Sequence, residues 1–111
     1  MTKILVVEDE AAMRLALSGL LKKEGYEITL ASSAREGLDA IEDGAFDLVL
    51  TDLNLGDGSG ADLVGRFGAA KVVAMTGRSE ADHEGARFDG WLTKPVSVDR
   101  LTKTLQSMLP A

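Results

Sequence analysis

Short, almost wholly apolar segments alternate with longer segments of helical period along this chain, and that alternation limits its fold more than any other feature. The apolar segments are rich in Val, Ile and Leu and lack the polar–apolar alternation of half-exposed strands. Such segments are typical of strands covered on both faces of a parallel sheet. They span Lys3–Val7, Ile28–Ala31, Phe46–Thr51, Lys71–Met75 and Gly90–Leu92.

The segment from Ala11 to Lys23 is predicted to be an amphipathic helix. Asp9 or Glu10 is placed to cap its start, and Gly25 is placed to end it. Its apolar residues form one stripe, which contains Met13, Leu17, Leu20 and Leu21.

Four further segments have helical character. Ser33 and Glu36 form a capping-box pattern at the start of a second helix. Ser97 is placed to cap the last helix. The weaker stretches are Ala61–Phe67 and Ser79–Ala86. The apolar faces are expected to contain Leu38 and Ile41 in the second helix, and Val98, Leu101, Leu105, Met108 and Leu109 in the last.

A strand followed by a helix, repeated five times, predicts an α/β doubly wound parallel sheet with right-handed crossovers. The second strand brings only Ala31 and Ser32 to its carboxyl end, which places it at an edge of the sheet. The 111 residues suffice for one ordinary domain, residues 1–111. After Lys94-Pro95 only one helix remains, so we expect no further domain to follow, although a domain cut from a longer protein would have the same sequence pattern.

Composition excludes several classes of function. The chain has no cysteine, which removes disulfides, thiolate metal sites and cysteine nucleophiles. Its net charge of −6 disfavours direct binding to nucleic acid, and its basic residues are scattered. The apolar run Ile4–Val7 is too short for a signal peptide, and no stretch is long enough for membrane insertion. We therefore expect a cytoplasmic protein.

The polar residues that carry chemistry follow the predicted strands. Because the carboxyl ends of parallel strands meet at one edge of the sheet, these residues are expected to lie close together. The first strand delivers Glu8 and Asp9, and the third delivers Asp52. The fourth delivers Thr76 and Gly77, and the fifth delivers Trp91 and, just beyond it, the ammonium group of Lys94.

Three neighbouring carboxylates repel one another, and a divalent cation relieves that repulsion. Mg²⁺ prefers oxygen ligands of this kind. With Mg²⁺ and Lys94 present, the charges of the three acids are balanced, which suits an incoming phosphoryl group. Asp52 would be ionised at neutral pH and could attack phosphorus without a general base. The product would be an aspartyl-phosphate whose oxygens Thr76 and Lys94 help to hold.

In these motifs the chain resembles the receiver domain of two-component response regulators. The resemblance covers the whole chain and rests on the acidic pair, the stretch that ends at Asp52, Thr76-Gly77, and Trp91 through Pro95. It implies a flavodoxin-like fold with strand order 2-1-3-4-5. It also implies that Asp52 accepts its phosphoryl group from a phosphohistidine, on a histidine kinase or a histidine phosphotransfer protein.

The same resemblance implies roles for single residues. Glu8, Asp9, Asp52 and the backbone carbonyl of Asn54 would surround Mg²⁺. Thr76 would reorient toward the phosphoryl group, Trp91 would change rotamer with it, and Lys94 would pair with a phosphoryl oxygen. The Lys94-Pro95 bond would be cis. Taken alone, Trp91 fits partly buried packing as well as it fits a switch.

The sequence departs from the receiver pattern in two places. Gly56 stands where the family usually has a proline, so we expect a more flexible loop over Gly56–Gly60. The intervals from Asp52 to Thr76 and from Thr76 to Lys94 are short, which predicts shortened third and fourth helices. Asn54 and Arg78, each two residues beyond a site residue, are expected to tune hydrolysis of the aspartyl-phosphate.

Three functions are compatible with these residues. The first is a phosphoacceptor response regulator that switches a surface recognised by a downstream protein. The second is a pseudo-receiver, a protein-interaction module that keeps the fold and is not phosphorylated. The third is a small phosphatase that turns over phosphate esters through Asp52, whereas a receiver would stop at one phosphoryl group per chain.

Overall fold

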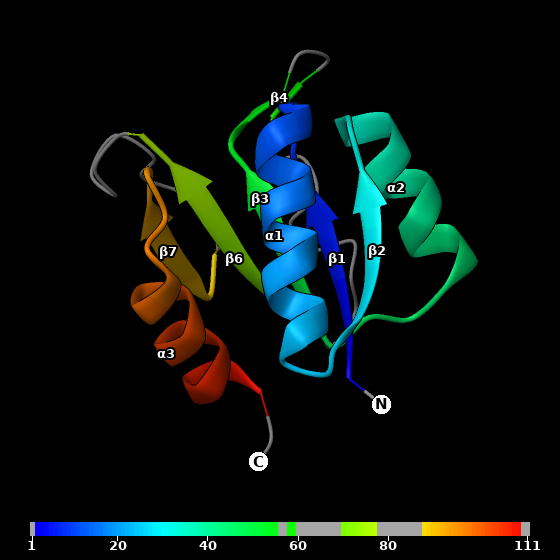
Figure 1. Cartoon of the computed structure of the whole chain (residues 1–111). Coiled ribbons are helices and arrows are strands. Elements are labelled where there is room, and N and C mark those ends of the chain that lie inside the picture. The colour runs from blue at the N-terminus through cyan, green and yellow to red at the C-terminus, as the bar shows by residue number, and fades with distance from the viewer. Residues whose placement is uncertain (1, 56–57, 60–69, 78–87, 110–111) are drawn as a thin grey trace.

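A five-stranded parallel sheet forms the centre of the computed structural model, which describes residues 2–55, 58–59, 70–77 and 88–109 (Figure 1). Its strands lie in the order β2-β1-β3-β6-β7, and each neighbouring pair is parallel. Counted along the chain, this is the predicted order 2-1-3-4-5. The strands are β1 (Lys3–Val7), β2 (Glu27–Ala31), β3 (Leu48–Asp52), β6 (Lys71–Thr76) and β7 (Gly90–Thr93).

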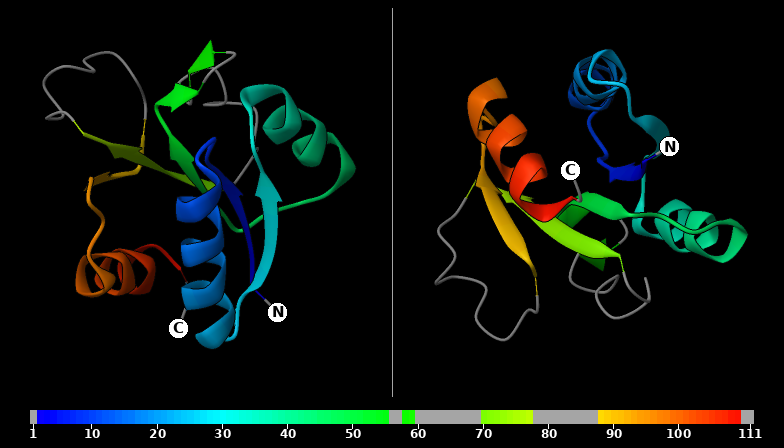
Figure 2. Two further views of the ribbon diagram at one scale, coloured as in Figure 1. Left: turned by 45° about the horizontal axis from the view of Figure 1, so that its top comes forward. Right: turned by 90° about the horizontal axis from the view of Figure 1, so that it is seen from below.

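Helices cover both faces of this sheet, as a doubly wound fold requires. Helices α1 (Ala11–Lys23) and α3 (Val98–Met108) lie on one face, and α2 (Ala34–Asp43) lies on the other (Figure 2). The predicted helices Ala61–Phe67 and Ser79–Ala86, and with them their expected shortening, lie outside the described residues. Within the described residues, no helix is long and apolar enough to cross a membrane.

Alternate residues of the central strands point to opposite faces and so build two cores. In β1, Ile4 and Val6 pack in the core beneath α1 and α3, whereas Leu5 and Val7 pack in the core beneath α2. Strand β3 is buried along its whole length. Because β1 and β3 are covered on both sides, the sheet holds the ends of these two strands rigidly at its carboxyl edge.

Capping residues fix the start of α2, the start of α3 and the end of α1. Ser33 caps α2 through its hydroxyl, which accepts a hydrogen bond from the Glu36 amide, and Ser97 caps α3 in the same way. Gly25 follows α1 with a positive φ of 93°, and the amide of Tyr26 donates back to the Leu21 carbonyl. These predicted boundaries are confirmed.

Several expectations from the sequence are wrong in detail. Strand β2 is not covered on both faces, since only Ala31 is buried in this edge strand. Val98 is 53% exposed, because it occupies the first position of α3, beyond the part of the helix that lies over the sheet. A short antiparallel pair, β4 (Asn54–Leu55) with β5 (Gly58–Ser59), occupies part of the segment that was expected to be a loop.

Gly90 allows α3 to approach β7 closely. A Cβ atom at this position would lie 2.6 Å from the terminal methyl group of Met108. Gly90→Ala is therefore expected to lower the free energy of unfolding by about 1 kcal/mol, because Met108 must move. Gly19→Ala is the matched control, since Gly19 lies in α1 with open space around it, and it should raise stability by about 1 kcal/mol. Urea unfolding measures both, and stabilisation by both substitutions would contradict the close packing.

Candidate functional site

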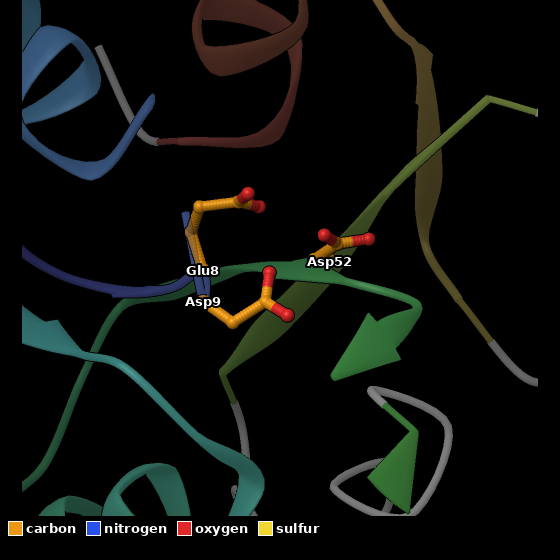
Figure 3. A group of neighbouring side chains, drawn as sticks. All are labelled: Glu8, Asp9 and Asp52. Carbon is orange, nitrogen blue, oxygen red and sulfur yellow. The ribbon is translucent and has the colours of Figure 1, made fainter. Parts of the chain in front are cut away.

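Three carboxylates meet where β1 and β3 end. Glu8 and Asp9 directly follow β1, and Asp52 is the last residue of β3. The two strands are hydrogen-bonded neighbours with Val7 opposite Thr51, so both ends fall at one level of the sheet edge. One carboxylate oxygen from each acid lies within 4.8 Å of the others (Figure 3). Glu8 and Asp52 are buried, whereas Asp9 is exposed to solvent.

Lys94 brings a positive charge to the two buried acids. Its Nζ lies 2.8 Å from Oδ2 of Asp52 and 3.3 Å from one carboxylate oxygen of Glu8. The lysine follows β7 at the same sheet edge, where its amide donates to the Thr76 carbonyl over 2.7 Å. The Lys94–Pro95 peptide bond is cis. The site therefore contains three acids and one ammonium group, and a net negative charge remains when all are ionised.

Burial changes the proton affinity of Glu8. Loss of solvent raises the pKa of Glu8 from 4.5 to about 7, and a hydrogen bond with Asp52 and the negative charge of Asp52 act in the same direction. Lys94 opposes this shift without cancelling it. For Lys94 itself, burial alone would lower the pKa, but its contacts with Asp52 and Glu8 outweigh burial and raise it. Lys94 is therefore charged at neutral pH, while Glu8 holds its proton to a higher pH than an exposed glutamate does.

Thr76 and Trp91 occupy neighbouring strands beside this cluster. Thr76 ends β6 and is buried, and Trp91 lies in β7. The indole of Trp91 is half-buried and makes an edge contact with the ring of Phe88, with centroids 5.0 Å apart. The contact with Phe88 could not be predicted from the sequence, because an aromatic residue just before a strand usually serves only for packing. The structure therefore places Trp91 in a contact that a rotamer change would alter.

The structure describes the backbone of Asn54 but does not describe Arg78, the other residue predicted to tune hydrolysis. Asn54 begins β4, two residues after Asp52. Its backbone carbonyl stays a predicted fourth metal ligand. Arg78 lies outside the described residues, so its predicted influence on hydrolysis stays a prediction.

The loop between β1 and α1 is held in a way that the sequence did not indicate. Neither Glu8 nor Asp9 caps α1: the cap position is Glu10, whose side chain makes no capping hydrogen bond. Instead Arg14, in the first turns of α1, donates to the backbone carbonyls of Glu8 and Asp9. Side-chain bonds to backbone carbonyls carry no sequence pattern, so a single helical arginine could not be assigned this contact in advance.

The donor set fits a hard divalent cation. Three carboxylates within reach of one another offer only oxygen ligands, and Asp9 keeps one side of the group open to water. Mg²⁺ is bound in proteins by one or two carboxylates together with several waters. The residues present are therefore compatible with Mg²⁺, and its divalent charge would offset the negative charge of Asp52, which together with burial raises the pKa of Glu8.

Glu8 predicts a pH dependence of stability in the metal-free protein. Its pKa is higher in the folded state, about 7, than in the unfolded chain, so its contribution is full below about pH 4.5 and is lost as pH rises through 7. The free energy of unfolding in EDTA should thus fall by about 3 kcal/mol between about pH 5 and pH 8 on account of Glu8. Urea unfolding at several pH values measures this, and Glu8→Gln should remove most of the slope. An equal slope in both proteins would contradict the assignment.

The family follows from comparison with known proteins. The family model for the response regulator receiver domain matches residues 4–106. The chain therefore belongs to the response regulator receiver family, the family that the sequence motifs resemble.

Its curated relatives are longer proteins of the same family. The chain is 30% identical over 115 residues to the cell cycle transcriptional regulator CtrA of Caulobacter vibrioides, covering 96% of this chain and 50% of CtrA. It is 36% identical over 118 residues to the sensory transduction protein RegX3 of Mycolicibacterium smegmatis, covering 98% of this chain and 51% of RegX3. The chain thus spans about half the length of these relatives.

Solved structures share the fold over nearly the whole chain. The chemotaxis protein CheY4 of Vibrio cholerae is similar with a TM-score of 0.89 and 30% identity, covering 98% of this chain and 99% of that one. The response regulator TrrA of Thermotoga maritima, solved in complex with Mg²⁺ and BeF, is similar with a TM-score of 0.88 and 30% identity, covering 98% of this chain and all of TrrA.

Proposed function

We propose that this receiver domain is a phosphoacceptor in two-component signalling and that Asp52 carries the phosphoryl group. The observation that carries the proposal is the position of Asp52. It is buried at the end of a central strand, it is paired with Lys94 at 2.8 Å, and it has a carboxylate oxygen within 4.8 Å of those of Glu8 and Asp9. The site thus places a carboxylate nucleophile beside Lys94, among acids that could hold the Mg²⁺ needed to offset the negative charge of a phosphoryl group.

The proposed donor is a phosphohistidine of a histidine kinase or a histidine phosphotransfer protein. A carboxylate oxygen of Asp52 forms a bond to phosphorus as the bond from phosphorus to the donor imidazole nitrogen breaks. The imidazole leaves with the electron pair of that bond. Apart from this bond to Asp52, no covalent step by the protein is needed. The catalysis therefore consists of positioning and charge compensation.

Each neighbouring residue has a proposed part in this transfer. Glu8, Asp9, Asp52 and the carbonyl of Asn54 would hold Mg²⁺, which supplies charge compensation for the phosphoryl oxygens when bound. Lys94, whose Nζ already lies 2.8 Å from Asp52, would pair with one phosphoryl oxygen of the product.

Four residues are proposed to act after the transfer. Thr76 would donate its hydroxyl to another phosphoryl oxygen, and Trp91 would leave its contact with Phe88 as the surface changes. Asn54 and Arg78 would tune the later hydrolysis. This switched surface, read by a downstream protein in the cytoplasm, is the proposed output.

A donor reaction tests this function. Incubation with acetyl phosphate and Mg²⁺, followed by intact-mass spectrometry, should add one phosphoryl group per chain, and EDTA should prevent the addition. An unchanged mass under both conditions would contradict the proposal and favour a pseudo-receiver. Continued release of phosphate from added phosphate esters, beyond one equivalent per chain, would favour a phosphatase instead.

A further inference from the structure

The guanidinium group of Arg14 contacts the backbone of both residues that supply the acidic pair. One of its terminal nitrogens donates to the Glu8 carbonyl over 2.9 Å and to the Asp9 carbonyl over 3.2 Å. We propose that Arg14 is a positioning residue, which fixes the loop so that the carboxylates of Glu8 and Asp9 face Asp52. This inference rests on the proposed function, because it concerns the affinity of the acidic cluster for Mg²⁺.

The loop needs such a contact because the helix that follows offers little to hold it. Helix α1 has no acidic residue in its first turn, and the side chain at its cap position, Glu10, makes no capping hydrogen bond. On the other side, the Glu8 amide donates to the Ala31 carbonyl of β2 over 3.0 Å. Arg14 therefore holds the carbonyl side of a segment whose amide side is held by the sheet.

Holding the three carboxylates close together is electrostatically unfavourable. The backbone of the loop must keep Glu8 and Asp9 in place against this repulsion. One oxygen of each carboxylate lies within 4.8 Å of the others, and ionised carboxylates at such distances favour separation. Asp9 is exposed, so without a fixed backbone its carboxylate is free to turn toward water. Partners that orient metal ligands commonly change metal affinity by 10- to 100-fold when they are removed.

Charge and position predict opposite effects for the loss of Arg14. As a nearby positive charge, Arg14 repels Mg²⁺, so its removal would tighten Mg²⁺ binding if charge were its only contribution. As a positioning residue, its removal must weaken binding. The sign of the change in affinity therefore separates the two roles.

The test uses Mg²⁺ titrations of the whole chain by calorimetry at low ionic strength. Arg14→Met keeps the aliphatic stem and should weaken Mg²⁺ binding about tenfold. Arg14→Lys keeps the charge but loses the guanidinium, and should weaken binding by a smaller factor. Lys22→Ala is the control, because it removes one exposed positive charge from the far end of the same helix, and should leave the affinity within about twofold.

A second measurement needs no metal. Hydrogen exchange of the amides of residues 9–11 in EDTA should be faster in Arg14→Met than in the wild type, whereas exchange in β3 should be unchanged. Equal or tighter Mg²⁺ binding by Arg14→Met would overturn the inference. If that variant does not fold, affinity of Arg14→Lys equal to that of the wild type would overturn it. Failure of the wild type to bind Mg²⁺ would instead contradict the proposed function.

Discussion

Asp52→Asn is expected to lower the rate of phosphorylation by acetyl phosphate about a thousandfold or more. At that rate no phosphorylated product should be detected. The amide has no anionic oxygen to attack phosphorus, and of the two buried acids of the cluster Asp52 lies nearer to Lys94, at 2.8 Å against 3.3 Å for Glu8. The measurement is the rate at which the intact mass gains one phosphoryl group in the presence of Mg²⁺.

The variant should remain folded, so loss of structure would not explain the result. Lys94 keeps its contacts with Glu8, at 3.3 and 3.4 Å, and loss of the Asp52 charge removes one cause of the raised pKa of Glu8. Asp39→Asn makes the same chemical change on an exposed position of α2 and should be phosphorylated like the wild type. Equal phosphorylation of Asp52→Asn and Asp39→Asn would contradict the assignment of the acceptor.

Lys94→Met is expected to change phosphorylation and Mg²⁺ binding in opposite directions. The rate of phosphorylation should fall about a hundredfold, because an ammonium group no longer compensates charge on the transferred group. Mg²⁺ should bind about tenfold more tightly, because the ammonium lies 2.8 Å from Asp52 and competes for the same carboxylates. Calorimetric titration measures the second effect.

The same variant should also alter stability. Without Lys94 the buried carboxylates of Glu8 and Asp52 have lost their positive partner, so the free energy of unfolding in EDTA should fall by about 3 kcal/mol near pH 8. Addition of Mg²⁺ should recover most of this loss. Lys103→Met, on the exposed side of α3, should show none of these changes. Weaker Mg²⁺ binding by Lys94→Met would contradict the proposed competition.

The strand ends explain why so much of the site could be predicted from the sequence. Parallel strands share one carboxyl edge, so Glu8, Asp52 and Lys94 had to meet once their strands were recognised, and the ion pairs follow from that register. Mutual repulsion of the acids was also foreseeable. That Glu8 would be the acid with the raised pKa was not foreseeable. The shift depends first on burial of Glu8, which a short sequence pattern does not specify.

The features that were missed depend on geometry between elements. The contacts of Arg14 join a side chain to backbone carbonyls, which are the same in every residue type and leave no pattern. Exposure of Val98 depends on where α3 begins relative to the sheet, and exposure of β2 depends on how much of an edge strand the helices cover. Apolar composition alone cannot distinguish these positions from core positions.

Identification of the modified side chain tests the central claim most directly. After reaction with acetyl phosphate and Mg²⁺, reduction with borohydride converts an aspartyl-phosphate to homoserine, which peptide mass spectrometry can locate. Homoserine is expected at position 52, with no reduced acid at positions 8 and 9. Homoserine at position 9, the longer alcohol 2-amino-5-hydroxypentanoate that a glutamyl-phosphate would give at position 8, or a stable phosphoryl group on a hydroxyl or imidazole side chain would contradict the assignment of Asp52 as the acceptor.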